Sequence, residues 1–345
     1  MSNEAYALQV SRYPVGQVGA DDFELVPVDL PEVADGQVLV RTTWTSVDPG
    51  LRLRLRADAP EGYFPAFPLH QPMDGIVTIG VIEESRAEGF PVGATVWHSY
   101  GWRTHAVVDA GEVAMNGLAS LRVLDVDGIA PQTYLGPMGP MGLTAYAGLH
   151  VIGAIDDEPR TIWVSAAAGA VGVLVCQMAR QLGHRVVASA GTDEKVRWLL
   201  DEIGVDAAFD RHDGPLGESL AQAAPEGIDL YFDAVGGDHL EAALAAMRPF
   251  GRIALCGSVG DYEREPAGPR NLFLATSKNL TMRGYRGSSY VDLLDEMQRR
   301  VRAWIQDGSV TVKETVYDGL DQAPRALADL MAGRTTGKTL VRVGD

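Results

Sequence analysis

The stretch V-S-A-A-A-G-A-V-G at residues 164–172 decides the fold of this chain. The β-branched and aromatic residues of 160–164 directly before it predict a buried strand. The apolar residues of 173–182 directly after it predict a helix that ends at Gly183. A strand, a tight turn of small residues and a helix form the arrangement in which a dinucleotide pyrophosphate meets a helix N-terminus.

The spacing of small residues in this stretch is A-x-x-G-x-x-G, with Ala166 where the usual fingerprint has its first glycine. Small side chains let the backbone approach the phosphates, and the N–H groups of the first helical turn face their negative charge. Glycines at this spacing also serve plain packing of a helix on a strand. The motif by itself therefore leaves both roles open.

The second half of the chain favours the binding role, because strand and helix patterns alternate along it. Further strands are predicted at 185–190, 207–210, 228–233, 252–256 and 280–285. Helices are predicted between and after them at 193–203, 216–224, 240–247 and 291–305. Two such βαβαβ halves form a doubly wound parallel sheet of the Rossmann type, which binds dinucleotides.

The first third of the chain has a different pattern. Short strands are predicted at 6–10, 23–26, 37–44, 75–83 and 93–98, separated by Pro, Gly and Asp. They indicate a compact antiparallel barrel or sandwich, which the strands at 310–317 and 338–343 are expected to rejoin. The sequence thus predicts an α/β protein in which residues 131–309, the dinucleotide-binding domain, are inserted into a β-rich domain of residues 1–130 and 310–345.

The composition of the chain limits the kinds of partner it can bind and the compartment in which it is expected. The 345 residues carry a net charge of −17 and no basic run, which argues against nucleic acid. No uninterrupted apolar segment is long enough to span a bilayer, so no membrane partner is expected. The two cysteines, Cys176 and Cys256, lie in apolar patterns and indicate a reducing compartment. Since the start of the chain shows no signal-peptide pattern, we expect a cytoplasmic protein.

The end of the second predicted strand favours NADP over NAD. An NAD site usually has an acidic residue there, which accepts hydrogen bonds from the ribose hydroxyls. Here the strand ends without a carboxylate, and Asp193 and Glu194 are better explained by the first turn of the next helix. Lys195 and Arg211 are cations that could meet a 2′-phosphate. A solvated position on the helix face is an equal alternative for Lys195.

The residues that could carry out chemistry argue against a metal site and favour a tyrosine as the reactive group. No C-x-x-C pair is present, and His70, His98 and His105 could be brought together only by folding, so no metal site is expected. No G-x-S-x-G elbow is present, which argues against a serine hydrolase. Tyr262 follows the fifth strand and is therefore expected at the carboxyl edge of the sheet, where ligands bind. An ordinary loop tyrosine is the alternative.

Several segments together resemble the zinc-independent medium-chain dehydrogenase/reductase family, and most closely its prostaglandin reductase and alkenal (enone) double-bond reductase branch. The resemblance covers nearly the whole chain, and the segments that carry it are 44–49, 142–146, 166–172, 193–195, 231–237, 271–273 and 336–338. It implies a GroES-like catalytic domain with a Rossmann insertion, commonly in a homodimer. It also implies NADPH-dependent reduction of the C=C bond of an α,β-unsaturated ketone or aldehyde, by hydride transfer to the β-carbon.

The resemblance also implies roles for single residues. It places Tyr262 as a donor to the developing enolate oxygen, and Lys195, with Gly191 before it, near the 2′-phosphate. At the pyrophosphate it places Ala166, Gly169, Ala170, Val171 and Gly172. Along the rest of the cofactor it places Thr144, Val235, Cys256, Gly257, Phe273 and Gly337.

The chain departs from the family pattern at three places. Asp210 and Arg211 stand where the family often has Asn-Tyr. Either Arg211 replaces the tyrosine as a phosphate contact, or Asp210 weakens the preference for NADP. Gly50 stands where an aromatic residue often follows Asp-Pro, and Thr336 where asparagine is frequent. The loop 62–68, with Tyr63, is expected either to wall the substrate pocket or to be a packed surface loop.

Two other functions remain open at this point. An NADPH:quinone reductase would use the same cofactor and the same kind of site. A non-catalytic NADP-binding sensor would use the cofactor only to set the closure of its domains.

Overall fold

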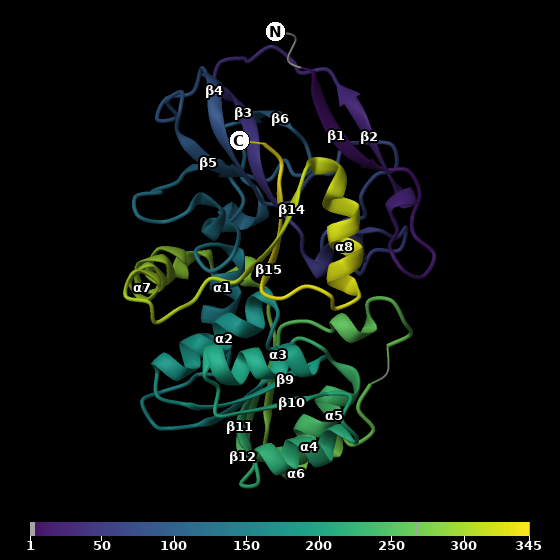
Figure 1. The fold of residues 1–345 in the computed structure, drawn as a ribbon, viewed down its shortest axis with the longest axis vertical. Helices are drawn as coiled ribbons and strands as arrows, with labels where there is room; N and C mark the ends of the chain where they lie inside the picture. The colour runs from purple at the N-terminus through teal and green to yellow at the C-terminus, as the bar shows by residue number, and fades with distance from the viewer. Residues whose placement is uncertain (1–3, 267, 345) are drawn as a thin grey trace. The chain divides into compact units, whose positions relative to one another are not determined.

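The computed structural model describes residues 4–266 and 268–344 (Figure 1). The chain divides into two compact units. The described residues up to Gly136, together with those from Glu314 onward, form the first unit, and Pro137–Lys313 form the second.

The first unit is built on two mainly antiparallel sheets. A two-stranded sheet pairs β1 (Ala5–Val10) with β2 (Phe23–Val28). A larger sheet has the order β14-β15-β3-β4-β5-β7, and β6 also pairs with β3. Its strands are β3 (Gln37–Ser46), β4 (Thr78–Ser85), β5 (Thr95–His98), β6 (His105–Asp109), β7 (Arg122–Val123), β14 (Glu314–Asp318) and β15 (Lys338–Arg342). Of the described strands in the two sheets, only β14 and β15 pair in parallel. Because β15 pairs with β3, the C-terminal strand completes the sheet of the first third of the chain.

Short helices close the edges of this unit around an apolar core. They are η1 (Ala20–Asp22), η2 (Pro49–Arg54), η3 (Met115–Gly117), η4 (Pro131–Leu135), η9 (Leu320–Gln322) and α8 (Ala323–Met331). Trp102, Phe67 and Leu327 of α8 are fully buried in one cluster. The indole N–H of Trp102 donates to the Ser46 carbonyl at 3.0 Å, which satisfies its polar atom inside the core.

The second unit contains a six-stranded sheet with the order β10-β9-β8-β11-β12-β13, in which every neighbouring pair is parallel. This is the strand order of a doubly wound dinucleotide-binding fold, so the predicted fold class is confirmed. The strands are β8 (Thr161–Val164), β9 (Arg185–Ala190), β10 (Ala207–Asp210), β11 (Ile228–Asp233), β12 (Met247–Leu255) and β13 (Thr281–Gly284).

The helices of this unit are α1 (Pro140–Ala147), η5 (Gly148–Ile152), α2 (Ala170–Gln181), α3 (Asp193–Trp198), η6 (Leu199–Ile203), α4 (Leu216–Ala223), α5 (Gly237–Ala246), η7 (Val259–Asp261), α6 (Phe273–Ser277), η8 (Gly287–Leu293) and α7 (Leu294–Gln306). Helices α2 to α6, with η6 and η7, lie between successive strands of this unit, whereas α1 and η5 precede β8, and η8 and α7 follow β13. The core between sheet and helices includes Trp163, whose ring stacks on Tyr231 with centroids 4.4 Å apart. Both rings are fully buried, which anchors β8 against β11.

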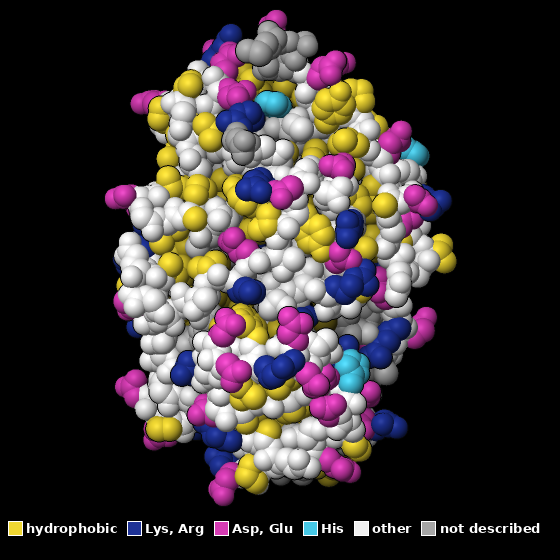
Figure 2. Space-filling view, viewed as in Figure 1, with side chains coloured by type: hydrophobic (Ala, Val, Ile, Leu, Met, Phe, Trp, Pro, Cys, Tyr) yellow, Lys and Arg dark blue, Asp and Glu magenta, His cyan; other side chains and the backbone are white. Residues whose placement is uncertain are grey.

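The surface carries charges of both signs. On the face shown in Figure 2, the side chains of Asp and Glu are interspersed with those of Lys and Arg. Among the described residues, none of the helices combines the length and the apolar character needed to cross a membrane.

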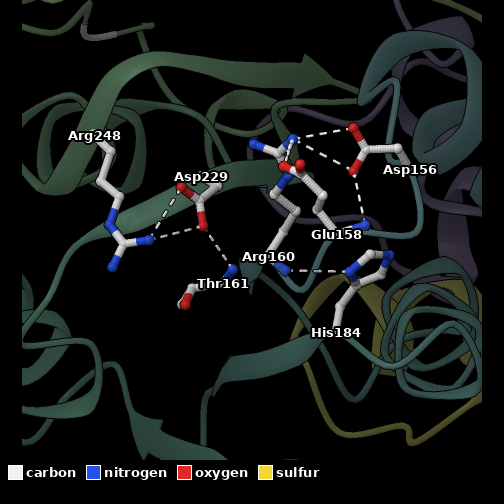
Figure 3. A network of polar contacts seen from close by, with 7 residues as sticks. All are labelled: Asp156, Glu158, Arg160, Thr161, His184, Asp229 and Arg248. Carbon is white, nitrogen blue, oxygen red and sulfur yellow. Dashed lines mark hydrogen bonds and ion pairs between the residues drawn. The ribbon is translucent and has the colours of Figure 1, made fainter.

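A polar network ties together the amino ends of the central strands of the parallel sheet (Figure 3). Asp229 of β11 accepts a hydrogen bond from the backbone N–H of Thr161, the first residue of β8, at 2.8 Å. Its carboxylate also pairs with Arg248 at 3.2 Å. On the other side of β8, the backbone N–H of Arg160 donates to the His184 ring at 3.3 Å. The Asp229 side chain is only 17% exposed, so its contacts stabilise the strand ends largely away from water.

We expect Asp229→Ala to lower the free energy of unfolding by about 1–3 kcal/mol, since it leaves the Thr161 N–H without its acceptor and removes one of the partners of Arg248, which also bonds Glu226. Urea unfolding followed by circular dichroism measures the change. Asp229→Asn keeps an acceptor and should lose less. Glu158→Ala is the matched control, because the Glu158 side chain is 79% exposed and its ion pair is screened by water. Equal stability of Asp229→Ala and the wild type would contradict this role.

Candidate nucleotide and substrate site

The turn between β8 and α2 has the geometry of an anion-binding turn. Ala166 has a φ of +47°, in the left-handed region, and its carbonyl accepts the N–H of Gly169 at 2.9 Å. The first helical backbone bond runs from the Val173 N–H to the Gly169 carbonyl at 3.0 Å. The N–H groups of the preceding residues of α2 therefore point beyond the helix end, where a negative group binds.

Gly172 is required by packing in this turn. A Cβ atom at position 172 would lie 2.5 Å from the Ala166 carbonyl oxygen and 2.8 Å from the Ala167 Cα. Any side chain there would push α2 away from the turn. The structure thus brings Ala166, Gly169 and Gly172 together in one compact turn, with Ala170 and Val171 at the start of the helix.

A second region of the candidate site lies after strands β9 and β10 and contains Gly191, Lys195 and Arg211. The Arg211 Nε lies 3.4 Å from the point where a Cβ of Gly191 would stand, and the Arg211 N–H bonds the Ala190 carbonyl at 2.9 Å. Thr192 caps α3 by accepting the Lys195 N–H at 3.3 Å. Burial lowers the pKa of the half-buried Lys195 ammonium, Glu194 opposes this, and the charge of Arg211 lowers it further. Arg211 thus influences Lys195 electrostatically in this region.

Asp210 does not face this region as a free acceptor. The residue is buried, and its carboxylate accepts the backbone N–H of His212 at 2.9 Å. The carboxylate thus closes its own turn after β10. Of the two alternatives that the sequence leaves open, this geometry favours Arg211 as the functional residue of the pair.

The turn after β11 is held by a buried carboxylate that the sequence analysis missed. Asp233 accepts hydrogen bonds from the Tyr231 hydroxyl at 2.9 Å and from the N–H groups of Val235 and Gly236 at 2.9 and 2.8 Å. Burial raises the pKa of Asp233, and the N–H donors oppose this rise. Asp233 therefore fixes the backbone of Val235, one of the predicted cofactor contacts. Its place at the last position of a buried strand is the signal that could have identified it.

Tyr262 lies at the carboxyl edge of the sheet, as its position after β12 predicts. Its hydroxyl oxygen lies 3.2 Å from the point where a Cβ of Gly257 would stand. The loop before it is bound to the β11 turn, because Gly260 N–H donates to the Val235 carbonyl at 3.1 Å. Burial, with smaller contributions from Cys256 and Asp261, raises the pKa of the Tyr262 hydroxyl above its usual value of 10. The phenol therefore keeps its proton at neutral pH and can act as a hydrogen-bond donor.

Tyr285 is a second residue at this edge that the sequence analysis did not single out. It directly follows β13, and its hydroxyl donates to the Thr144 carbonyl at 2.8 Å. Its hydroxyl also lies within hydrogen-bond reach of the Cys256 side chain, whose pKa burial raises to about 12. Tyr285 thus joins two predicted cofactor contacts. The hydroxyl of Thr144 itself donates to the Pro140 carbonyl at 2.8 Å, within α1.

Phe273 lies at the start of α6, and its side chain is 76% exposed. In the first unit, Gly337 has a φ of +70° and directly precedes β15. The next residue, Lys338, is only 3% exposed, and its ammonium donates to the Val47 carbonyl at 2.9 Å and to Asp48 at 2.8 Å. This contact joins the segment that contains Asp48 to the one that contains Lys338.

The histidines considered as metal ligands have other surroundings. His98 is fully buried, its Nδ1 accepts the Tyr100 N–H at 3.1 Å, and burial lowers its pKa to about 3. His105 lies 3.7 Å from Glu83, and His70 has a left-handed backbone with φ of 58°. Over residues 4–266 and 268–344, no three side chains of His, Cys, Asp or Glu converge in a way that could hold a metal ion.

Two family models match the chain. Residues 7–115 match the N-terminal domain of oxidoreductase, and residues 170–306 match the zinc-binding dehydrogenase model. Among curated proteins, the NADP(+)-dependent 2-alkenal reductase of Nicotiana tabacum is 35% identical, over 99% of this chain and 98% of its own. Prostaglandin reductase 1 of Bos taurus is 36% identical, over 96% and 97%.

The solved structures agree with these relatives. CurA from Vibrio vulnificus in complex with NADPH is 31% identical, with a TM-score of 0.90 and 99% of each chain covered. The quinone oxidoreductase of Escherichia coli in complex with NADPH has a TM-score of 0.77 at 20% identity, which shows a shared fold. The chain belongs to the zinc-independent medium-chain dehydrogenase/reductase family, in the branch that contains the prostaglandin and alkenal (enone) reductases.

Proposed function

We propose that this protein uses NADPH to reduce the C=C bond of α,β-unsaturated ketones and aldehydes. The observation that carries the proposal is the position of the Tyr262 hydroxyl in the loop after β12, 3.2 Å from where a Cβ of Gly257 would stand, in a unit whose first turn has the backbone geometry of an anion-binding turn. The 2-alkenal reductase of Nicotiana tabacum and the (+)-pulegone reductase of Mentha piperita, 35% and 34% identical, support the reaction class.

The cofactor site is assembled from the residues described above. The helix end at Ala166, Gly169, Ala170, Val171 and Gly172 would hold the pyrophosphate. Lys195 and Arg211 would hold the 2′-phosphate, and Gly191 lies beside the Arg211 guanidinium. The rest of the cofactor would lie along Thr144, Val235, Cys256, Gly257, Phe273 and Gly337.

NADPH, when bound, supplies the hydride for the β-carbon of the substrate. As the hydride arrives, negative charge develops on the carbonyl oxygen, and a preformed donor stabilises it. Tyr262 is placed to be that donor, because its raised pKa keeps the proton on the phenol. The α-carbon then takes its proton from solvent. In this scheme Tyr262 stabilises the enolate and undergoes no net change.

In this proposal the second unit carries the contacts to the pyrophosphate and to the 2′-phosphate. We propose a homodimer, with β13 as the pairing surface, because this strand is at the edge of the sheet and three of its four residues are exposed. A cytoplasmic location fits the two free cysteines.

NADPH consumption measured across a panel of enones, alkenals and quinones tests the activity. We expect turnover on enones and alkenals, since their carbonyl oxygen can accept from Tyr262. Turnover restricted to quinones would favour a quinone reductase. Tight NADPH binding without oxidation on any substrate would favour a sensor. The wild-type protein incubated with NADPH alone is the control.

The change Tyr262→Phe removes the donor while it keeps the ring. We expect turnover on an enone to fall about a hundredfold, with the dissociation constant for NADPH changed little. Steady-state kinetics and titration calorimetry measure the two effects. Unchanged turnover would remove Tyr262 from the mechanism.

The changes Lys195→Ala and Arg211→Ala each remove one cation from the proposed 2′-phosphate site. We expect each to weaken NADPH binding about tenfold or more, because charge-assisted contacts to phosphate are lost. NADH binding should change far less. Arg197→Ala is the matched control, since this exposed arginine lies on the same helix, α3. An equal loss of NADPH and NADH affinity would contradict the role of the altered residue.

A further inference from the structure

Ser165 is a buried polar residue that joins two turns at the carboxyl edge of the parallel sheet. It directly follows β8 and precedes Ala166, the first residue of the proposed pyrophosphate turn, and it is fully buried. Its hydroxyl donates to the Phe232 carbonyl at 3.2 Å and accepts the Ala234 N–H at 3.0 Å. The donor and an acceptor site of this hydroxyl are therefore both used by backbone at the end of β11, the neighbouring strand.

The turn after β11 is bonded in turn to the loop that contains Tyr262. Backbone N–H groups of this loop donate to the carbonyls of three consecutive residues, 233–235. The bonds run from Cys256 and Gly257 to Asp233 at 2.8 and 3.1 Å, from Val259 to Ala234 at 3.0 Å, and from Gly260 to Val235 at 3.1 Å. Tyr262 comes two residues after the last of these donors. The backbone of 233–235 therefore sets the place of the Tyr262 loop within this unit.

Close packing adds to these hydrogen bonds. A Cβ atom on Gly236 would stand 2.9 Å from the Ser258 Cβ and 3.1 Å from an Asp261 carboxylate oxygen. A Cβ atom on Gly260 would stand 2.9 Å from the Val235 carbonyl oxygen. Because the two segments touch at these points, a movement of the β11 turn is transmitted to the loop by contact as well as by hydrogen bonds.

Ala234 is the residue through which Ser165 reaches this loop. Its N–H donates to the Ser165 hydroxyl, and its carbonyl accepts the Val259 N–H. The next two N–H groups of the turn, at 235 and 236, donate to the Asp233 carboxylate, which belongs to β11 itself. Ser165 adds a bond from the neighbouring strand and so connects the proposed pyrophosphate turn to the loop of Tyr262.

We propose that Ser165 is a positioning residue for the reduction: through Ala234, its hydroxyl keeps the loop of Tyr262 where the phenol can donate to the substrate oxygen. This inference rests on the proposed function, because that function makes Tyr262 the enolate donor. Ser165 itself takes no part in the chemistry, since its hydroxyl is fully buried and bonded to backbone on both sides.

The proposed pyrophosphate turn depends less on this hydroxyl than the Tyr262 loop does. The backbone N–H of Ser165 donates to the Phe232 carbonyl at 3.2 Å, and that of Ala167 donates to the Ser189 carbonyl at 3.0 Å. Both bonds remain when the side chain of residue 165 is shortened. Loss of the hydroxyl is therefore expected to lower turnover while it changes the affinity for NADPH little.

Hydrogen exchange followed by mass spectrometry tests the positioning without any substrate. In Ser165→Ala the Ala234 N–H loses its acceptor, and we expect the amides of 256–262 to exchange about tenfold faster. Ser189→Ala is the matched control, because Ser189 is also a buried serine, and its hydroxyl accepts the Trp163 indole N–H at 3.3 Å. This control should leave exchange in 256–262 unchanged. Unchanged exchange there in a folded Ser165→Ala protein would overturn the inference.

A double-mutant cycle tests whether Ser165 acts through Tyr262, with methyl vinyl ketone as the enone. We expect Ser165→Ala to lower kcat about tenfold in the wild type. In the Tyr262→Phe background the same change should lower kcat less than about twofold, because the donor that Ser165 positions is already absent. An equal fall of kcat in both backgrounds would show a merely structural role and overturn the inference.

Two further measurements separate the possible failures. Thermal melting and titration calorimetry with NADPH show whether each variant is folded and binds the cofactor. If Ser165→Ala does not fold, Ser165→Cys replaces it in both experiments, since a thiol is a much weaker acceptor than a hydroxyl. Wild-type protein that turns over no enone would overturn the proposed function, whereas the exchange rates alone decide whether Ser165 fixes the loop.

Discussion

The close approach of α2 to the turn before it is the constraint on which the rest of the second unit depends. A Cβ atom on residue 172 would lie within 3 Å of the backbone of Ala166 and Ala167. The helix can pack this closely because residue 172 is glycine. That approach points the free N–H groups of the first helical turn toward one spot at the carboxyl edge of the sheet. The order of the parallel strands then brings the turns after β9, β11 and β12 to the same edge.

At this edge, several polar side chains bond main-chain groups of the protein itself. Asp233, Asp210 and the Tyr285 hydroxyl each bond a nearby main-chain group. The edge also carries the cations Lys195 and Arg211 and the phenol of Tyr262. In the proposed function, the cations would meet a phosphate and the phenol would meet a developing enolate oxygen.

The sequence predicted the parallel sheet and its turns well, because periodicity and glycine spacing report on local backbone. It placed the fifth strand at 252–256, whereas β12 already begins at Met247. There Pro249, Gly251 and the left-handed Phe250 suggest a turn, but pairing with β11 across a register shift extends the strand. The contacts of Tyr285 were out of reach for a related reason. They depend on Thr144 and Cys256, which only folding brings close to it, and one sequence carries no signal of such distances.

Ala166, in the turn between β8 and α2, has a left-handed backbone although it is not a glycine. The energy that shapes this turn is therefore separate from the energy of binding the phosphates, whereas many binding loops combine the two. A non-glycine residue in this conformation costs roughly 1–2 kcal/mol, and the fold bears this cost whether or not a nucleotide is present. The bonds from Gly169 to the Ala166 carbonyl and from Ala167 to the Ser189 carbonyl hold the turn in shape. The loop is therefore preorganised, so nucleotide binding need not supply the energy to order it. A substitution at position 166 would therefore change both the conformational cost of this turn and a residue of the proposed pyrophosphate site.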